Sequence, residues 1–402
     1  MARLPSRLQP LFPLLKRGHR FATRRVGALT RRTTNIAGAR AVPAQATLSA
    51  RETARLEPES VTLHPGGPAE PRHRPMPEGL PANHWFFDLK QDFTFAPRFT
   101  LEMHDGLVVG NYAAHITNGG LLDLETSSYF GIAHWTEHPI YLRARLPEPQ
   151  RVSGRLLSLA APGSFGNYYH WLMDALPRLG VLAETMPGVA PDVLFTNSTS
   201  AYHRGFLDLL GLSDLPRVEA SKHSAARADV VLDPAIVNAH TMGPRWVTEW
   251  LRATFPAEST SDKPERLYIT RGNQPNTRRV NNESAILEIL KPLGFEVFDP
   301  GAHTVREQID HFAAAKTIVA PHGAALTNLN FCAAGVGLLE LFAPQYLNPG
   351  YWTIIDNVPD TRYRYLIGEG TDPGPTGSNN QVMADITVNL RQFQALLEEI
   401  LD

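Results

Sequence analysis

"EVFDPGAHTVREQIDHFAAAKTIVAPHG", residues 296–323, is the stretch that decides the fold. Short apolar runs stand near its two ends, at 296–300 and 317–323, and residues 304–315 between them have the length and composition of a helix. A strand, a helix of ten or more residues and a second strand are typical of a unit whose two strands run parallel in one sheet. The stretch therefore predicts a parallel α/β sheet.

The same alternation continues on both sides of this unit. We expect strands at 151–160, 192–197, 228–237, 266–271 and 336–344, and helices at 166–179, 201–212, 243–255 and 281–295. A polar linker, 256–265, divides the alternation into two blocks. Two such blocks predict the α/β class, with two Rossmann-like domains facing across a cleft. We place the domains at 81–258 and 264–385, followed by a C-terminal helix at 386–402.

The chain begins with a segment of different composition. All eleven Lys and Arg residues up to Arg51 precede the first acidic residue, Glu52, so the start is basic and the rest is acidic. Pro and Gly then accumulate in 57–81, a composition that packs poorly. We expect residues 1–80 to form a disordered basic arm, and short β-type runs to make 83–150 β-rich. The arm could be a solvated tail, a segment attracted to a membrane surface, or a mitochondrial presequence.

Composition excludes several classes of protein. The only cysteine is Cys332, so neither an intramolecular disulfide nor a cysteine-based zinc site is possible within the chain. No apolar run approaches the roughly 18 residues that span a bilayer, and we find no secretory signal pattern. We therefore expect a cytoplasmic protein, with the arm as a possible contact to the inner face of the membrane.

"GNYYHWLMDALPRL", residues 166–179, predicts a helix with an apolar stripe. Asn167 is a good N-cap, because its side chain can accept a hydrogen bond from the first turn. Leu172, Leu176 and Leu179 then repeat at helical spacing, so they predict the side that faces the core. Pro177 cannot donate to the preceding turn, and we expect it to kink the helix.

A second stripe on this helix carries polar side chains. His170, Asp174 and Arg178 follow one another at four-residue spacing, away from the leucines. The positive end of the helix dipole would help to keep His170 neutral, so either this imidazole or the carboxylate of Asp174 could accept a proton. The alternative is a surface row of ion pairs, each of which would stabilise the helix by about 0.3 kcal/mol.

"IVAPHGAALTNLNF", residues 318–331, runs from a strand into a small-residue loop and a helix start. His322, Gly323 and Ala324 would let the backbone approach a ligand, and free N–H groups at a helix start suit phosphate. Thr327 and Asn328 could add side-chain hydrogen bonds. The alternative is a tight structural turn. The sequence lacks the phosphate-loop pattern that ends in Gly-Lys-Ser or Gly-Lys-Thr.

Three arginines follow the strand predicted at 266–271. Arg271, Arg278 and Arg279 surround a Gly/Asn/Pro loop, after which Asn281 or Asn282 caps the next helix. Open α/β sheets bind ligands at the carboxyl ends of their strands, and the planar guanidinium group suits a diphosphate. At the end of another strand, Glu340 could accept hydrogen bonds from ribose hydroxyls. A solvated basic loop and a solvated strand-end charge are the alternatives.

These segments, in this order, resemble glycosyltransferase family 61, in a bacterial-type member of the kind found in capsular and exopolysaccharide biosynthesis. The matching pieces are "GNYYHWLMDALPRL", "YITR" with "RRVNNE", "GFEVFDP", "EQIDHFAAAKTIVAPHGAALTNLNF" and "LLELF", which cover roughly residues 150–345. The resemblance implies a GT-B architecture, with 81–258 on the acceptor side and 264–385 binding a nucleotide sugar. It also implies transfer with inversion, usually without a bound metal.

The resemblance also assigns roles to individual residues. The family's His-x-x-x-Asp pair falls on His170 and Asp174. Its donor-binding positions fall on Arg271, Arg279, Asn282, Glu283, His322, Gly323, Ala324, Thr327 and Asn328. Many relatives have Gly where this chain has Ala325, and the membrane anchor of eukaryotic members is missing.

We therefore predict an inverting glycosyltransferase that moves a sugar from a nucleotide donor, by resemblance a UDP-sugar, to a glycan hydroxyl in cell-surface polysaccharide synthesis. Asp174 or His170 would take the acceptor's proton, while the arginines and the amides near His322 stabilise the leaving diphosphate. We expect no cofactor, metal or nucleic-acid partner. The alternatives are a nucleotide-sugar epimerase of GT-B fold, which needs no acceptor, and a non-catalytic nucleic-acid-binding or sugar-binding protein.

Overall fold

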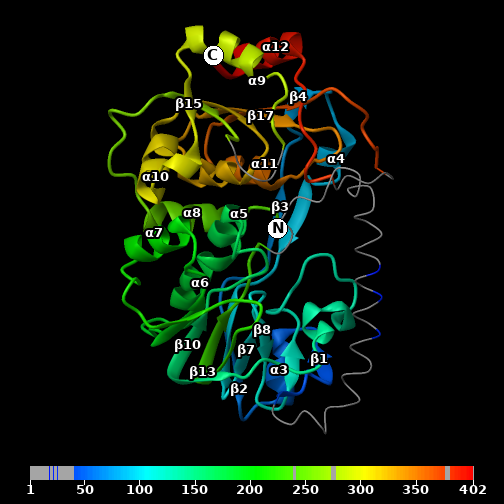
Figure 1. Ribbon diagram of the computed structural model, residues 1–402, viewed down its shortest axis with the longest axis vertical. Helices are drawn as coiled ribbons and strands as arrows, with labels where there is room; N and C mark the ends of the chain where they lie inside the picture. The colour runs from blue at the N-terminus through cyan, green and yellow to red at the C-terminus, as the bar shows by residue number, and fades with distance from the viewer. Residues whose placement is uncertain are drawn as a thin grey trace. The chain divides into compact units, whose positions relative to one another are not determined.

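The structure is a computed structural model that describes residues 18, 21, 25, 40–238, 241–272, 278–375 and 381–401. The fold is mixed α/β, as predicted, and divides into two compact units (Figure 1). Among the described residues, the N-unit contains 40–69 and 96–238, and the C-unit contains 70–95 and 241–401. None of the helices within the described ranges has the length and apolar character needed to cross a bilayer.

The C-unit is built on a parallel sheet of six strands. Their order is β15-β14-β16-β17-β18-β4. The bounds are β4 (Glu78–Leu80), β14 (Arg266–Ile269), β15 (Glu296–Phe298), β16 (Thr317–Pro321), β17 (Gly337–Phe342) and β18 (Arg362–Ile367). Every residue of β16 and β17 is buried, as expected for strands covered on both faces. From β14 the chain passes to β15 on one side and then to β16 on the other, which creates a switch point.

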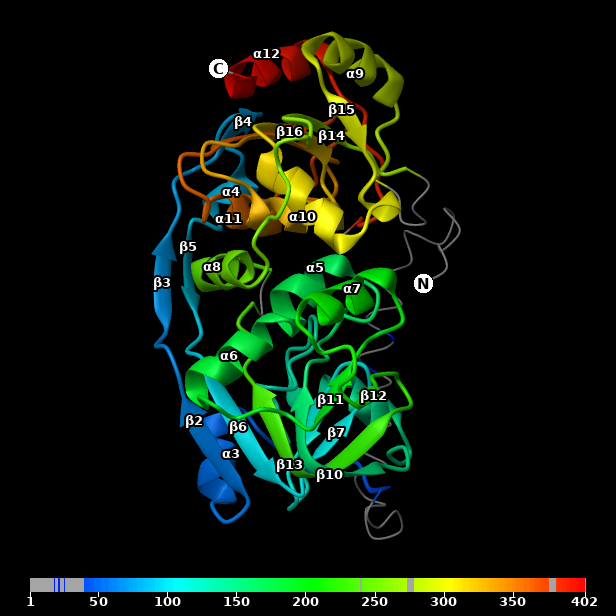
Figure 2. The ribbon, with the colours of Figure 1, turned by 90° about the vertical axis from the view of Figure 1, so that its left-hand side faces the viewer.

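Helices cover both faces of this sheet (Figure 2). One face carries α9 (Glu283–Leu290) and α12 (Leu390–Leu401), and the other carries α10 (Val305–Ala314) and α11 (Gly350–Ile355). The C-unit also contains α4 (Trp85–Asp88), the antiparallel pair β3 (Glu70–His73) and β5 (Asp92–Phe95), α8 (Arg245–Thr254) and the 3₁₀ segments η6 (Lys291–Leu293), η7 (Pro300–Ala302) and η8 (Ala324–Phe331). A capping box between Thr304 and Glu307 starts α10 where the sequence predicts a helix.

The N-unit is built on a mixed sheet of ten strands. The parallel part is β13-β10-β11-β12, and the antiparallel strands β6 and β7 pair with β13. The strands are β1 (Gln45–Thr47), β2 (Val61–Pro65), β6 (Phe99–His104), β7 (Leu107–Val109), β8 (Ala114–Ile116), β9 (Leu121–Asp123), β10 (Gln150–Ser158), β11 (Val193–Thr196), β12 (Arg217–Glu219) and β13 (Ala225–Pro234). The helices are α3 (Ala50–Leu56), η3 (Trp135–Glu137), η4 (Pro139–Leu142), α5 (Tyr168–His170), the π-helix η5 (Trp171–Ala175), α6 (Pro177–Thr185) and α7 (Ala201–Leu209).

The predicted arm is wrong for residues 45–80, which contain β1, α3, β2, β3 and β4. Pairing with distant strands outweighs the local Pro and Gly content: β1 pairs with β9, β2 with β6, and β4 with β18. Most of residues 1–39 lie outside the described part of the chain. The domain boundaries also differ, because 70–95 and α8 pack in the C-unit. Within the stretch 83–150, which is predicted to be β-rich, residues 85–88 form the helix α4 instead.

Candidate functional site

The predicted helix at 166–179 contains a π turn. Asn167 caps it by accepting from the backbone N–H of Tyr169, as predicted. A π-type bond then joins the N–H of Leu176 to the carbonyl of Trp171 over 2.9 Å. Pro177, which lacks an N–H, takes the first position of α6 and so needs no bond to the preceding turn. The expected irregularity at the proline is therefore a widened turn that carries Asp174.

His170 and Asp174 form a hydrogen-bonded pair at the carboxyl edge of the parallel strands β10 and β13. Nδ1 of His170 lies 2.6 Å from Oδ2 of Asp174, and the amide of Asn238 donates to Oδ1 over 2.9 Å. Asn238, which follows β13, also donates to the Tyr169 hydroxyl over 3.1 Å. Within the described residues, no hydrogen bond occupies Nε2 of His170. The carboxylate thus orients the ring, and Nε2 is the atom left to meet a ligand.

The third member of the predicted polar stripe has another role. Arg178 is only 1 % exposed, and its guanidinium contacts Asp233 and donates to the carbonyls of Pro234 and Ala160, each over 2.8 Å. Burial lowers the pKa of Arg178, whereas Asp233 raises it. The alternative of a solvated surface row is therefore wrong, because Arg178 ties α6 to the ends of β10 and β13.

A glycine loop packs against the ring of His170. Gly163 has a φ of +85°, and a Cβ there would lie 2.6 Å from Cδ2 of His170. Nε2 of His203 donates to the carbonyl of the next residue, Ser164, over 2.9 Å, and Nδ1 accepts from the N–H of Ser200. Burial lowers the pKa of His203, which favours this neutral form. Sequence reasoning missed His203 and Asn238, although Asn238 directly follows a predicted strand.

In the C-unit, two of the predicted arginines meet the predicted glycine loop. Arg271 follows β14 and Gly323 follows β16, the neighbouring strands that flank the switch point. A Cβ on Gly323 would clash with the guanidinium of Arg271, so a larger residue at 323 would displace this side chain. Arg278 donates to the carbonyl of His322 over 2.9 Å and lies over the ring of Tyr346. Burial, followed by the charge of Arg278, lowers the pKa of Arg271 to about 10, which leaves it cationic at neutral pH.

His322 forms a second histidine–carboxylate pair beneath this loop. Nδ1 lies 2.6 Å from Oε1 of Glu340, and Oε2 accepts from the hydroxyl of Tyr363 over 2.9 Å. Glu340 is fully buried, so the predicted contact with a ribose is wrong. Burial raises the pKa of Glu340 to about 8 and lowers that of His322 well below its ordinary value. Near neutral pH, both shifts favour an uncharged pair in which Glu340 donates to Nδ1 and Nε2 of His322 carries a proton.

The helix start after Gly323 is of the 3₁₀ type, and this redirects two predicted ligands. With three residues per turn, Thr327 sits above Ala324 and donates to its carbonyl over 2.7 Å. Asn328, which is fully buried, donates to the side chain of Gln308 over 3.0 Å. The predicted donor contacts of Thr327 and Asn328 are therefore wrong. The first backbone N–H groups of η8, at Ala324 and Ala325, have no partner within the helix itself.

The remaining predicted residues surround the start of α9. Asn282 is its N-cap, but its amide pairs with the backbone of Val388. Glu283 accepts from the hydroxyls of Tyr268 and Thr270. Glu283 thus fixes the connection between β14 and α9, whereas Asn282 ties the start of α9 to the segment before α12. Arg279 has an exposed side chain with no hydrogen bond or ion pair to the described chain, so it is available to a ligand.

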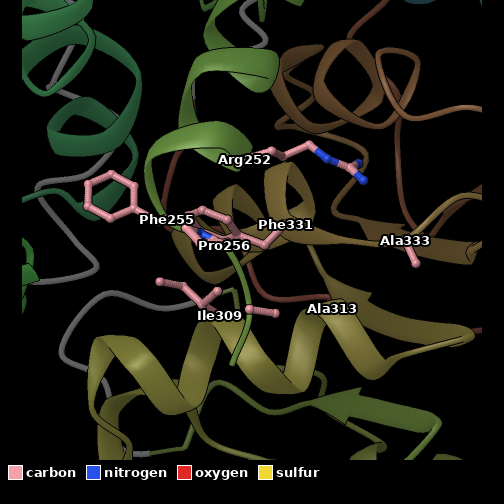
Figure 3. Close-up of a pocket in the computed structure, with 8 residues that line it drawn as sticks. Arg252, Phe255, Pro256, Ile309, Ala313, Phe331 and Ala333 are labelled. Atoms are coloured by element: carbon pink, nitrogen blue, oxygen red, sulfur yellow. The ribbon is translucent and has the colours of Figure 1, made fainter. Parts of the chain in front are cut away.

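The described chain also contains a small apolar pocket in the C-unit (Figure 3). It has a volume of about 200 Å³ and is lined by Arg252, Phe255, Pro256, Ala257, Ile309, Ala313, Phe331 and Ala333. None of these residues is a predicted site residue. Across the ranges that the structure describes, His, Cys, Asp and Glu side chains do not gather in threes or more as a metal site would require.

Comparison with known proteins gives one positive finding. No curated protein matches the chain. One family model matches a segment of the chain. The segment begins at Tyr168, the first residue of α5, and ends in β17, one residue before Glu340. Residues 168–339 match the family model Glycosyltransferase 61, which confirms the resemblance over this stretch, less than half of the chain.

Proposed function

We propose that the protein is an inverting glycosyltransferase that moves a sugar from a nucleotide-sugar donor to a glycan hydroxyl. The observation that carries the proposal is the family match, which includes both the His170–Asp174 pair and the Arg271–Gly323 contact. The C-unit would bind the donor and the N-unit would activate the acceptor. The GT-B architecture, with Rossmann-like domains facing across a cleft, and a role in cell-surface polysaccharide synthesis belong to this proposal.

His170 is the base in the proposed reaction. Its Nε2 takes the proton of the acceptor hydroxyl, and the hydroxyl oxygen attacks the anomeric carbon of the donor. The bond between that carbon and the diphosphate oxygen breaks on the opposite face, so the configuration inverts. Asp174 keeps its hydrogen bond to Nδ1 and stabilises the imidazolium that forms. In this proposal His170 is the base and Asp174 orients it, whereas the sequence leaves these two roles open.

The diphosphate would bind beside Gly323. Arg271, Arg278 and Arg279 supply positive charge, and the free N–H groups at the start of η8 supply hydrogen bonds. Nε2–H of His322 adds a donor when its pair with Glu340 is uncharged. As the leaving diphosphate gains charge, these groups stabilise it. UDP is the expected nucleotide because of the family resemblance.

The experiment is release of nucleoside diphosphate from a panel of nucleotide sugars, with and without a panel of glycan acceptors. We expect acceptor-dependent release, and we expect Asp174→Asn to abolish transfer while donor binding, followed as a thermal shift, survives. Full activity of Asp174→Asn would remove this residue from the mechanism. Interconversion of the donor sugar without any acceptor would instead establish the epimerase alternative.

A further inference from the structure

An aromatic ring lies beside His170, outside all the residues assigned above. The ring of Phe130 lies with its centroid 4.9 Å from that of His170, at an interplanar angle of 47°. Phe130 is 49 % exposed, although it lies next to His170, whose hydrogen-bond partner Asp174 is buried. A ring so close to the base lies within reach of a group that binds next to His170.

The segment that carries Phe130 is held in place by its neighbours. The preceding ring, Tyr129, packs against Tyr112 and His138, with centroids 6.1 and 5.9 Å apart. The buried carboxylate of Glu137 accepts from the backbone N–H of Ala133 over 2.7 Å. Contacts on both sides of Phe130 therefore fix the loop, so its ring is presented by a supported backbone.

The segment that carries Phe130 contains no charged side chains. Residues 126–133, "TSSYFGIA", contain neither acidic nor basic side chains. A charged acceptor would find no counter-ion in this segment, whereas a neutral sugar combines a C–H face, which packs on an aromatic ring, with hydroxyls that remain hydrated. The nucleotide base is a poorer match, because the proton that His170 removes belongs to the acceptor.

We propose that Phe130 forms the acceptor subsite, on which a neutral pyranose ring packs so that one of its hydroxyls reaches Nε2 of His170. The inference rests on the proposed function and names its acceptor class: an uncharged sugar residue. Phe130 is a binding and specificity-determining residue, and the reaction itself remains that of His170.

The test uses the full-length chain and methyl pyranosides of glucose, galactose, mannose and xylose, observed by saturation-transfer NMR. At least one should bind the wild-type protein. Phe130→Leu keeps an apolar contact with His170 but removes the flat ring, and it should weaken binding about tenfold, whereas Phe130→Trp should retain it. Leu48→Ala, at another exposed apolar position of the N-unit, serves as the control and should bind as the wild type does.

Two results would overturn the inference: no binding of any pyranoside to the wild-type protein, or equal binding by the wild type and Phe130→Leu. The proposed function has a separate readout, the release of nucleoside diphosphate. If release never occurs but sugar binding depends on Phe130, the transferase proposal fails and Phe130 remains a sugar-binding residue without an acceptor role. If release occurs and Phe130→Leu changes the KM of the donor rather than that of the acceptor, the subsite fails and the transferase proposal stands.

Discussion

Two histidine–carboxylate pairs in this protein share one geometry and differ in their surroundings. In both, Nδ1 lies 2.6 Å from a carboxylate oxygen. The side chains of His170 and Asp174 are 13 % and 7 % exposed, whereas those of His322 and Glu340 are 4 % and 0 % exposed. The first pair thus keeps an opening to solvent, and the second lies beneath a loop.

The partner of the second carboxylate oxygen also differs. The amide of Asn238 donates to Asp174, and the hydroxyl of Tyr363 donates to Glu340. Around Glu340, burial outweighs the hydrogen bond and raises the pKa of the carboxyl to about 8. The same pair of residue types can therefore serve two purposes. A pair open to solvent can accept a substrate proton, and a buried, uncharged pair can hold a loop and present a hydrogen-bond donor.

Replacing each histidine in turn should separate these purposes, with the largest effect in the open pair. His170→Asn removes the base, and we expect kcat to fall by about 10³-fold with little change in donor affinity. His322→Asn should instead raise the Kd of the donor. Steady-state kinetics and donor titration measure both variants. A similar loss of donor affinity in His170→Asn would show that the first pair also binds the donor, so that catalysis and donor binding are not separated between the two pairs.

Much of the fold could be predicted because the local pattern agrees with the tertiary structure. The strands β11, β14, β16 and β17 and the helices α7, α8, α9 and α10 all fall within the predicted runs, and β10 and β13 overlap theirs but begin earlier. The segment 45–80 could not be predicted, since its strands are stabilised by partners far along the chain rather than by their own composition. Chain position likewise did not reveal that 70–95 packs in the C-unit.

The candidate site could be predicted only where the position of a residue in the chain determines where its side chain lies. Residues at strand ends, such as Arg271 and Gly323, do lie together, because parallel strands end at one edge. The orientation of a side chain after the first turn depends on the type of helix. A 3₁₀ rather than an α-helical start turns Thr327 inward, and the packing of β17 buries Glu340. Neither feature has a sequence signal that we can identify.

A smaller effect should follow from removing the hydrogen bond that supports Asp174 in the His170–Asp174 pair. Asn238→Ala removes the donor to Oδ1 of Asp174 and leaves the histidine contact in place. Since a hydrogen bond to a charged group contributes about 1.5–3 kcal/mol, we expect kcat to fall at least about tenfold, less than in His170→Asn. Asn238→Asp, which places a second carboxylate beside the first, should be no better. An unchanged kcat in Asn238→Ala would show that Asp174 needs no such support.

The smallest expected effect is on the free energy of unfolding. The buried His322–Glu340 pair should make this free energy depend on pH. Burial raises the pKa of Glu340 from 4.5 to about 8, so between these values the folded protein holds a proton that the unfolded chain has released. Stability from this group therefore falls as the pH rises. The lowered pKa of His322 has the opposite effect below its ordinary value of 6.5, because there the unfolded chain binds the extra proton. Only the contribution of Glu340 remains between about pH 6.5 and 8.

Glu340→Gln should remove this contribution while its amide still donates to His322 and its oxygen still accepts from Tyr363. Relative to the variant, the wild-type protein should lose up to about 2 kcal/mol of unfolding free energy between pH 6.5 and 8. Urea unfolding at several pH values measures the difference, in which other titrating groups cancel. Parallel curves for the two proteins would mean that Glu340 keeps the same charge over this range, and the contrast between the two pairs would then reduce to their exposure alone.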